Sequence, residues 1–266
     1  MSCADCNVVR RSIGWFGQLM PSASQYDAIA EQYRRSKSSP LRAYIEAYTF
    51  LNLIGDVRGK RVLDLACGEG FYSRRLKALG AASVTGVDIS VEMIRLAEQQ
   101  ERNDPQGIDF VCADVCELDD LGEFDVIVAA YLLHYAPSCT DLVRMCRNIK
   151  RHMSVTGRFV TLNENPDQAA GQYGGYEQYG FNKTIDKPAT DGAQITYFMV
   201  AGRELFKFHA HYYARQTYEQ VLTDVGFGRV AWHPLMLDPA GIEAHGVDYW
   251  QEYLDNPPVI GLECRV

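Results

Sequence analysis

The chain of 266 residues lacks the features of several specialised protein classes. It has no apolar run of about 18 residues, the length that a membrane-crossing helix needs, so we expect no integral membrane protein. Basic residues are outnumbered, with 26 Lys and Arg against 34 Asp and Glu, and the formal charge of -8 disfavours nucleic acid as a partner. No internal repeat is visible, and the overall composition excludes disordered, collagenous and coiled-coil classes. A small molecule is therefore the expected ligand, with the oligomeric state left open between monomer and homodimer.

Cysteine is present, but its pattern does not indicate a metal site or a disulfide framework. Cys3 and Cys6 have the spacing of half a zinc knuckle, and no second CxxC or HxxxH pair follows, so we expect no metal. Residues 1–23 lack the apolar core of a secretory signal and are predicted to be a frayed, disordered extension. Five further cysteines fall in or beside predicted buried segments, where a thiol acts as a small hydrophobe, and this favours a reducing cytoplasm: Cys67, Cys112, Cys116, Cys139 and Cys146.

Apolar periodicity predicts alternating strands and helices from residue 61 to residue 162. Two amphipathic helices, at 26–33 and 41–48, precede this region. The alternation implies right-handed crossovers and a doubly wound parallel sheet, and two late strands complete it as an antiparallel pair at its edge. We therefore predict an α/β fold with a Rossmann-like seven-stranded sheet, an antiparallel edge strand and N-terminal helices. The expected strands are 61–66, 84–89, 108–113, 124–130, 158–162, 227–236 and 258–265.

After residue 163 the alternation stops, and the sequence favours an inserted lid over about 167–213. Its first part is rich in Gly, Gln, Asn and Tyr, and two β-rich runs, 194–200 and 204–213, then predict a hairpin. A capping box, Thr217-x-x-Gln220, predicts that a helix begins there. The domain is thus expected to span 24–266, with the lid inside it.

The turn after the first predicted strand carries the clearest chemical signal. Small residues recur in the pattern Asp64-x-Ala66-x-Gly68-x-Gly70 and allow a ligand to approach the main chain closely. A carboxylate at residue 64 would repel a pyrophosphate, which argues against a dinucleotide, but it can hold an ammonium group directly or through water.

Two more acids follow the next two predicted strands. Asp88 stands where a carboxylate can accept both hydroxyls of a ribose, and Asp114 stands where it can accept the exocyclic amine of an adenine. Each acid alone is equally explained as a solvated loop residue or a helix cap. Three acids at three successive strand ends predict a nucleoside pocket.

The pattern from Asp64 to Gly70 resembles motif I of the class I S-adenosylmethionine (SAM)-dependent methyltransferases, D/E-x-G-x-G-x-G, over roughly 26–165. Ala66 departs from the motif at its first glycine. The resemblance implies SAM as cofactor and S-adenosylhomocysteine (SAH) as product, with Asp64, Ala66 and Gly68 at the methionine moiety. It implies Asp88 at the ribose and Asp114 at the adenine. The remaining implied cofactor contacts are Tyr26, Tyr33, Arg42, Ile89, Met93, Val115 and Ala130, although Tyr26, Tyr33 and Arg42 are also explained as ordinary residues of the N-terminal helices.

A narrower resemblance links 25–33, 64–72, 248–250 and 254–258 to the toxoflavin synthase family, which N-methylates an azapteridine. It implies methylation of a small planar heterocycle in cytoplasmic secondary metabolism. Alternatives are another small-molecule N- or O-acceptor, an aminopropyl transferase or NAD-linked enzyme of the same fold, and a non-catalytic SAM-binding protein.

The residues after the fourth predicted strand are the catalytic candidates: Tyr131, His134 as a proton acceptor, and Tyr135. A purely structural role explains His134 as well. Aromatic rings suit a planar substrate, although they also suit a small core beneath the lid. The predicted substrate contacts are Asn163, Tyr173, Tyr176, Phe181 and Tyr197.

Overall fold

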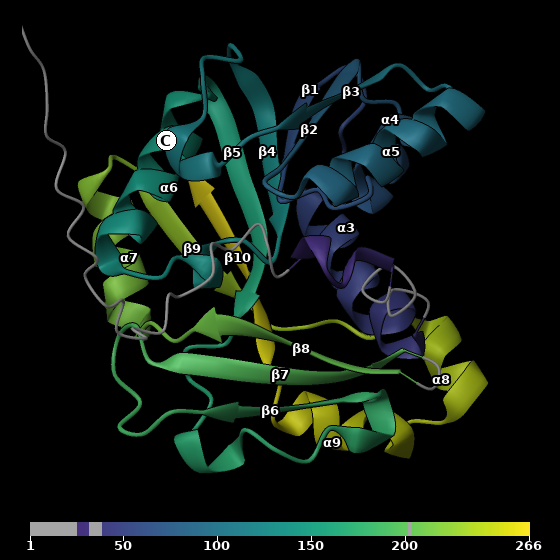
Figure 1. Ribbon diagram of the computed structural model, residues 1–266, viewed down its shortest axis with the longest axis vertical. Coiled ribbons are helices and arrows are strands. Elements are labelled where there is room, and N and C mark those ends of the chain that lie inside the picture. Colours follow the sequence, from purple (N-terminus) through teal and green to yellow (C-terminus); the bar gives the residue numbers. More distant parts are fainter. Residues whose placement is uncertain (1–25, 32–38, 202–203) are drawn as a thin grey trace, which may run out of the picture.

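The computed structural model describes residues 26–31, 39–201 and 204–266, so the predicted extension 1–23 lies outside the described residues. Within that described part, no helix combines the length and the apolar character that crossing a bilayer requires. Its strands form one large sheet and a second, smaller sheet, and helices cover both faces of the large sheet (Figure 1).

The large sheet has seven strands in the order β3-β2-β1-β4-β5-β10-β9. Strands β1 to β5 pair in parallel, and β10 runs antiparallel between β5 and the edge strand β9. This confirms the predicted Rossmann-like sheet. In register, Leu65 at the end of β1 pairs with Val87 of β2 and with Ala129 of β4, so three strands end side by side. The strands are β1 (Arg61–Leu65), β2 (Ser83–Asp88), β3 (Ile108–Cys112), β4 (Phe124–Ala130), β5 (Met153–Glu164), β9 (Arg229–His233) and β10 (Val259–Arg265).

Helices cover both faces of this sheet. Figure 1 shows α3 (Tyr48–Ile54), α4 (Phe71–Ala78) and α5 (Val91–Asn103) on one side, and α6 (Cys139–Arg151) and α7 (Arg215–Asp224) on the other. A π-helical segment, η1 (Arg42–Ala47), leads into α3. Short 3₁₀ segments are η2 (Val115–Glu117), η3 (Leu133–Tyr135), η4 (Ala170–Gln172) and η5 (Glu177–Tyr179).

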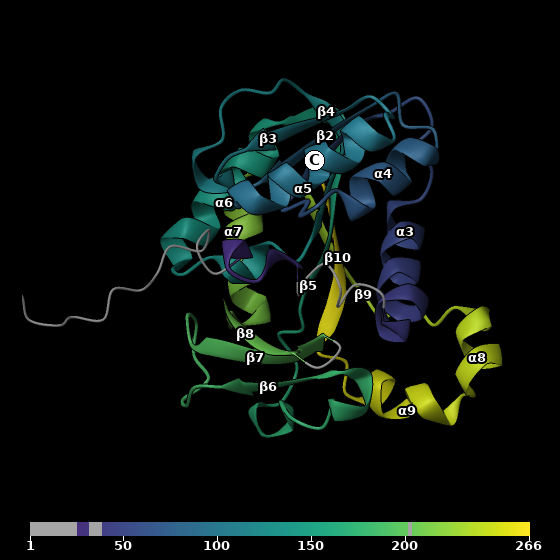
Figure 2. The ribbon, with the colours of Figure 1, turned by 45° about the vertical axis from the view of Figure 1, so that its right-hand side comes forward.

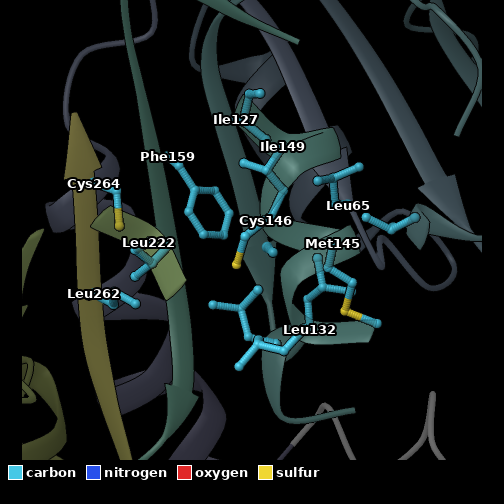
Figure 3. Packing of buried hydrophobic residues seen from close by; sticks show 14 of the residues in the cluster. Leu65, Ile127, Leu132, Met145, Cys146, Ile149, Phe159, Leu222, Leu262 and Cys264 are labelled. Carbon is cyan, nitrogen blue, oxygen red and sulfur yellow. The ribbon is translucent and has the colours of Figure 1, made fainter. Parts of the chain in front are cut away.

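The apolar core between the sheet and α6 and α7 explains part of the cysteine pattern. Cys146 of α6 and Cys264 of β10 are fully buried beside Phe159 in this cluster (Figure 3). Burial raises the pKa of the Cys146 thiol to about 12, so it packs as a neutral hydrophobe. The expectation of burial was wrong for Cys112 and Cys139, which are exposed because each stands at the end of its strand or helix rather than inside it.

The smaller sheet consists of β6 (Phe181–Ile185), β7 (Gln194–Ala201) and β8 (Glu204–His211), all antiparallel. The predicted hairpin is β7–β8, and β6 is a third strand that the sequence did not predict. Figure 2 shows this sheet lying across the end of the large sheet, with α9 (Asp248–Asp255) beneath it. We call β6, β7 and β8 the lid sheet.

Two helices between β9 and β10 were not predicted. Helix α8 (Pro239–His245) begins at an Asp-Pro pair, in which Asp238 caps the helix and accepts a hydrogen bond from the Ala240 amide at 2.9 Å. Helix α9 buries Trp250 and Tyr253 in an aromatic cluster shared with the lid sheet. Helix α9 therefore packs against the lid sheet, whereas α8 packs against Tyr44 of η1.

Candidate functional site

A cavity with an empty volume of about 830 Å³ lies where β1, β2 and β4 end. In parallel α/β sheets, the carboxyl ends of the strands are where ligands bind. We call this cavity the strand-end cavity. It is lined by Tyr26, Arg42, Ala66, Cys67, Gly68, Tyr72, Asp88, Ile89, Met93, Asp114, Val115, Ala130, Tyr131, Leu132, Tyr135 and Met145.

The backbone is strained at two points of this cavity wall. Ala66, with φ of 53°, and Tyr131, with φ of 72°, are the non-glycine residues of the described chain that adopt positive φ. Such a conformation costs an L-residue roughly 1–2 kcal/mol. Neighbouring strands hold it in place: the Tyr131 amide donates to the Leu162 carbonyl at 3.0 Å, and the Cys67 amide donates to Val87 at 3.0 Å. Strain of this kind is characteristic of ligand-binding sites.

Asp88 fixes the shape of the glycine turn. Its Oδ2 accepts from the Gly68 amide at 2.8 Å and its Oδ1 accepts from the Ser90 amide at 2.9 Å. These two bonds orient the carboxylate. Asp88 also lines the cavity.

The other two strand-end acids differ in placement. Asp114 lines the cavity, and its Oδ1 also accepts from the Cys116 amide at 2.8 Å. Asp64 does not line the cavity. It is 1% exposed, and its carboxylate accepts a hydrogen bond from the Ser73 hydroxyl at 2.6 Å, which ties β1 to α4. Of the two modes expected for Asp64, direct contact with a ligand is disfavoured by this placement, and contact through water stays a prediction.

An N-terminal segment forms part of the cavity wall. Tyr26 lines it, and the neighbouring Asp27 accepts from the Ser90 hydroxyl at 2.5 Å and from the Glu92 amide at 3.3 Å. These bonds anchor the segment to the beginning of α5. Arg42 also lines the cavity, whereas Tyr33 lies outside the described residues.

A second cavity, with an empty volume of about 530 Å³, adjoins the first. The two share Arg42, Tyr131 and Tyr135 as lining residues. We call it the aromatic cavity, because rings from the lid sheet and from α9 form much of its wall. It is lined by Ser39, Leu41, Arg42, Glu46, Tyr131, His134, Tyr135, Tyr179, Phe181, Tyr197, Met199, Phe208, Tyr253, Pro258 and Val259.

The three catalytic candidates all line the aromatic cavity. The Nδ1 atom of His134 lies 3.0 Å from Oδ1 of Asn163 and 3.2 Å from the amide nitrogen of Glu164. Burial lowers the pKa of His134, so the ring is neutral at pH 7. Burial raises the pKa of Tyr131 well above its ordinary value, so its hydroxyl keeps its proton and can donate a hydrogen bond.

Of the predicted substrate contacts, Phe181 and Tyr197 line the aromatic cavity and the other three do not. Asn163 instead orients His134. The Tyr176 ring stacks on Phe181 at 4.8 Å, and its hydroxyl donates to the Asn256 carbonyl at 2.7 Å. Tyr173 lies beneath the Lys183 ammonium group, 4.5 Å from its ring centre. These residues support the wall of the cavity from behind.

A buried ion pair joins the lid sheet to the large sheet. Lys183 of β6 pairs with Glu164 at the end of β5, and the Tyr197 hydroxyl donates to the same carboxylate. Both charged side chains are almost fully buried. Burial lowers the pKa of Lys183, and the Glu164 charge opposes that shift. The pair thus fixes β6 and β7, which carry Phe181 and Tyr197, over the end of β5.

Several lining residues were not predicted. In the strand-end cavity they are Cys67, Tyr72, Leu132 and Met145, which directly follow or pack beside predicted contacts. In the aromatic cavity, Glu46, Phe208 and Tyr253 had no individual signal, since a helix glutamate and ring residues in apolar stripes are typical of ordinary surfaces and cores. Among the described residues, no cluster of three or more His, Cys, Asp or Glu side chains could hold a metal ion.

Comparison with known proteins agrees with this geometry. A family model described as a methyltransferase domain matches residues 62–157, which run from β1 into β5. A ubiquinone biosynthesis O-methyltransferase of Neisseria meningitidis serogroup C is 32% identical over 135 residues, covering 48% of this chain and 52% of the relative. The chain thus spans about half the length of the curated relatives that it matches.

Solved structures extend the similarity to most of the chain. A SAM-dependent methyltransferase of Mesorhizobium loti superposes with a TM-score of 0.61 at 22% identity, covering 87% of this chain and 100% of that one. The [4+2]-cyclase SpnF has a TM-score of 0.59 at 16% identity, covering 91% of this chain and 94% of that one. At these identities the likeness concerns the fold alone. Residues 62–157 thus match a methyltransferase domain, and the chain has the Rossmann-like fold seen in solved SAM-dependent methyltransferases.

Proposed function

We propose that this chain is a methyltransferase that binds SAM in the strand-end cavity and methylates a small planar molecule in the aromatic cavity. The observation that carries the proposal is the wall shared by the two cavities, formed by Arg42, Tyr131 and Tyr135. Ligands held in adjoining cavities meet at such a wall, as direct group transfer requires.

The residues of the strand-end cavity suit the parts of SAM. Asp88 is the proposed acceptor for the ribose hydroxyls and Asp114 for the adenine amine, with Ile89, Met93 and Val115 as the apolar faces for the adenine ring. The turn at Ala66 and Gly68, together with Ala130, would contact the methionine moiety. Tyr26 and Arg42 are the proposed partners of its carboxylate. When bound, SAM supplies an electrophilic methyl group.

The chain's own part would be alignment, exclusion of water and control of protons. Well-oriented partners can gain roughly 7–11 kcal/mol over the same reaction in solution, and a strong electrophile leaves little for acid–base catalysis to add. His134 is neutral and lines the aromatic cavity, so it is the proposed proton acceptor. Tyr131 and Tyr135 border both cavities and would orient the reacting groups.

We propose an aromatic N-heterocycle, with a demethylated azapteridine as the first candidate, because the wall of the aromatic cavity is rich in rings and its two charged side chains, Arg42 and Glu46, have opposite signs. Tyr197 and Phe208 lie parallel, with ring centres 5.0 Å apart, and offer a flat contact to a planar ligand. The relative from Neisseria is named for O-methylation in ubiquinone biosynthesis, which makes a phenol the second candidate. The fold by itself does not imply methyl transfer, since a cyclase shares it.

The test begins with calorimetric titration of SAM and SAH into the wild type and Asp88→Ala. Loss of hydrogen bonds to a charged group should weaken SAM about 10- to 150-fold. Asp109→Ala removes an exposed carboxylate from the neighbouring strand β3 and should bind SAM like the wild type. A thermal melt of each variant checks the turn, because Asp88 also accepts from the Gly68 and Ser90 amides.

Turnover is then followed by SAH release with two acceptors, a demethylated azapteridine and a catechol. Methylation of the azapteridine supports N-methylation, and methylation of the catechol alone moves the assignment to O-methylation. Binding of SAM without turnover of either acceptor retains the nucleoside site and rejects both acceptors. Absence of SAM and SAH binding to the wild type rejects the proposed function altogether.

A further inference from the structure

One corner of the aromatic cavity carries three polar atoms that are buried without a hydrogen-bond partner. They are Oε2 of Glu46 and the hydroxyl oxygens of Tyr131 and Tyr253, and all three residues line the cavity. Buried polar side-chain atoms are normally hydrogen-bonded, and leaving one without a partner is costly. Three such atoms in one cavity wall can take a bound ligand as their partner. We call Glu46, Tyr131 and Tyr253 the polar corner.

The polar corner is built from parts of the chain that lie far apart in the sequence. Glu46 belongs to the π-helical segment η1, Tyr131 follows β4 in its strained conformation, and Tyr253 lies on α9 beneath the lid sheet. Glu46 is 5% exposed and Tyr253 is fully buried. A π-helical turn is rare and is frequently found at functional sites.

The polar corner contains one anionic side chain, Glu46, and the cationic side chain of Arg42 lies beside it. Arg42 lies on the same face of η1, with its Nε 3.7 Å from Oε2 of Glu46, which is an ion pair without a hydrogen bond. Its guanidinium lies 5.5 Å from the centre of the Tyr131 ring. Burial raises the pKa of Tyr253 well above its ordinary value, and the charge of Glu46 raises it further. The corner therefore offers one carboxylate acceptor and two phenol donors.

We propose that the polar corner recognises the methyl acceptor by one edge of a planar ring that presents an N–H or O–H donor beside a carbonyl or ring-nitrogen acceptor. Glu46 accepts the hydrogen bond from the donor, and the hydroxyls of Tyr131 and Tyr253 donate to the neighbouring acceptor atom. The rings of Phe181, Tyr197 and Phe208, which line the same cavity, contact the flat faces of the ligand. The inference rests on the proposed function, since it assumes that the aromatic cavity holds the acceptor.

The experiment compares two ligands that differ in the donor. Lumazine is a planar bicycle with N–H groups beside carbonyls, and 1,3-dimethyllumazine keeps the carbonyls without those N–H groups. Both are titrated into SAH-saturated wild type, Glu46→Gln and Tyr253→Phe, with Glu252→Gln, an exposed glutamate of α9, as the matched control. A melting curve for every variant establishes that it is folded.

The inference predicts that Glu46→Gln weakens lumazine about 10-fold and leaves 1,3-dimethyllumazine unchanged, because only the first ligand donates to the carboxylate. Tyr253→Phe should weaken both ligands roughly 3- to 10-fold, since it removes a donor to a carbonyl that both retain. Glu252→Gln should change neither.

Two results would overturn the inference while leaving the proposed function intact. In the first, SAH binds normally and lumazine binds Glu46→Gln as tightly as it binds the wild type. In the second, SAH binds normally, but the wild type binds neither lumazine nor 1,3-dimethyllumazine. Failure of the wild type to bind SAH would instead reject the proposed function, and the two cases are thus distinguished by the first titration.

Discussion

Replacing Lys183 with Met should strongly destabilise the chain. The substitution removes the ammonium group that pairs with Glu164, and the Glu164 carboxylate stays buried. Among the described residues, the Tyr197 hydroxyl is then the remaining side-chain donor to that carboxylate. Breaking a buried ion pair by deleting one partner costs about 3–5 kcal/mol, because the other charge stays uncompensated. That is a large share of the roughly 5–15 kcal/mol that holds a typical domain folded.

The loss should appear as a melting temperature lower by roughly 6–20 °C in circular dichroism or calorimetry. Lys207→Met makes the same chemical change at an exposed position of β8 and should shift the melting temperature little. The double variant Glu164→Gln with Lys183→Met removes both charges and should recover most of the loss. A melting temperature of Lys183→Met equal to that of Lys207→Met, or a double variant no more stable than Lys183→Met, would refute the reasoning.

Three further predictions concern the turn, the sheet and the buried histidine. Ala66→Gly should stabilise the chain by up to about 1 kcal/mol in urea unfolding and leave SAM affinity unchanged, because glycine adopts positive φ freely; a destabilised variant would show that Ala66 is not strained. Gly86→Ala should cost about 1–3 kcal/mol, since a Cβ there would lie 2.8 Å from the Phe110 ring, and adding Phe110→Leu should restore part of it. The pKa of His134 is lowered from 6.5 by burial, so below that pH the unfolded chain takes up a proton that the folded chain does not, and stability falls with falling pH. His134→Phe should make that fall shallower between about pH 7 and pH 5, and identical pH slopes would contradict this account.

The large sheet was predictable because its signals are local. Each strand from 61 to 162 is a short, mostly apolar or β-branched segment, and a glycine turn or a capping residue precedes the helix that follows. Ser90, for example, caps α5 by accepting from the Met93 amide at 3.2 Å. Alternation of that kind leaves few topologies to choose from. The doubly wound, seven-stranded sheet followed from pattern and handedness, whereas its strand order comes from the structure.

The lid sheet and its supports were harder to predict because their signals come from distant residues. The capping box at Thr217 and Gln220 was wrong: α7 begins at Arg215, and its first turn is capped from the lid by Asp191, which accepts from the Ala214 amide at 2.7 Å and from the Thr217 hydroxyl. A cap supplied from more than 20 residues away leaves no local pattern.

The same limit applies to single site residues. Tyr176 and Tyr197 are both buried rings of one aromatic cluster, yet Tyr197 lines the cavity and Tyr176 packs behind Phe181. Both are tyrosines of the predicted lid, and the packing of β6 and β7 over β5 separates them. The motif likewise does not separate direct contact of Asp64 with a ligand from contact through water, whereas the structure shows that its carboxylate accepts from Ser73 and does not line the cavity.

The two cavities also differ in where their residues come from, and this bears on substrate identity. All residues that line the strand-end cavity lie within 62–157, except Tyr26 and Arg42. In the aromatic cavity the reverse holds, because only Tyr131, His134 and Tyr135 come from that segment. Similarity to other methyltransferase domains over 62–157 therefore informs the cofactor side of the site and hardly constrains the acceptor side. Two chains that share this segment can methylate different molecules, and under the proposed function the acceptor of this one depends on η1, the lid sheet and α9.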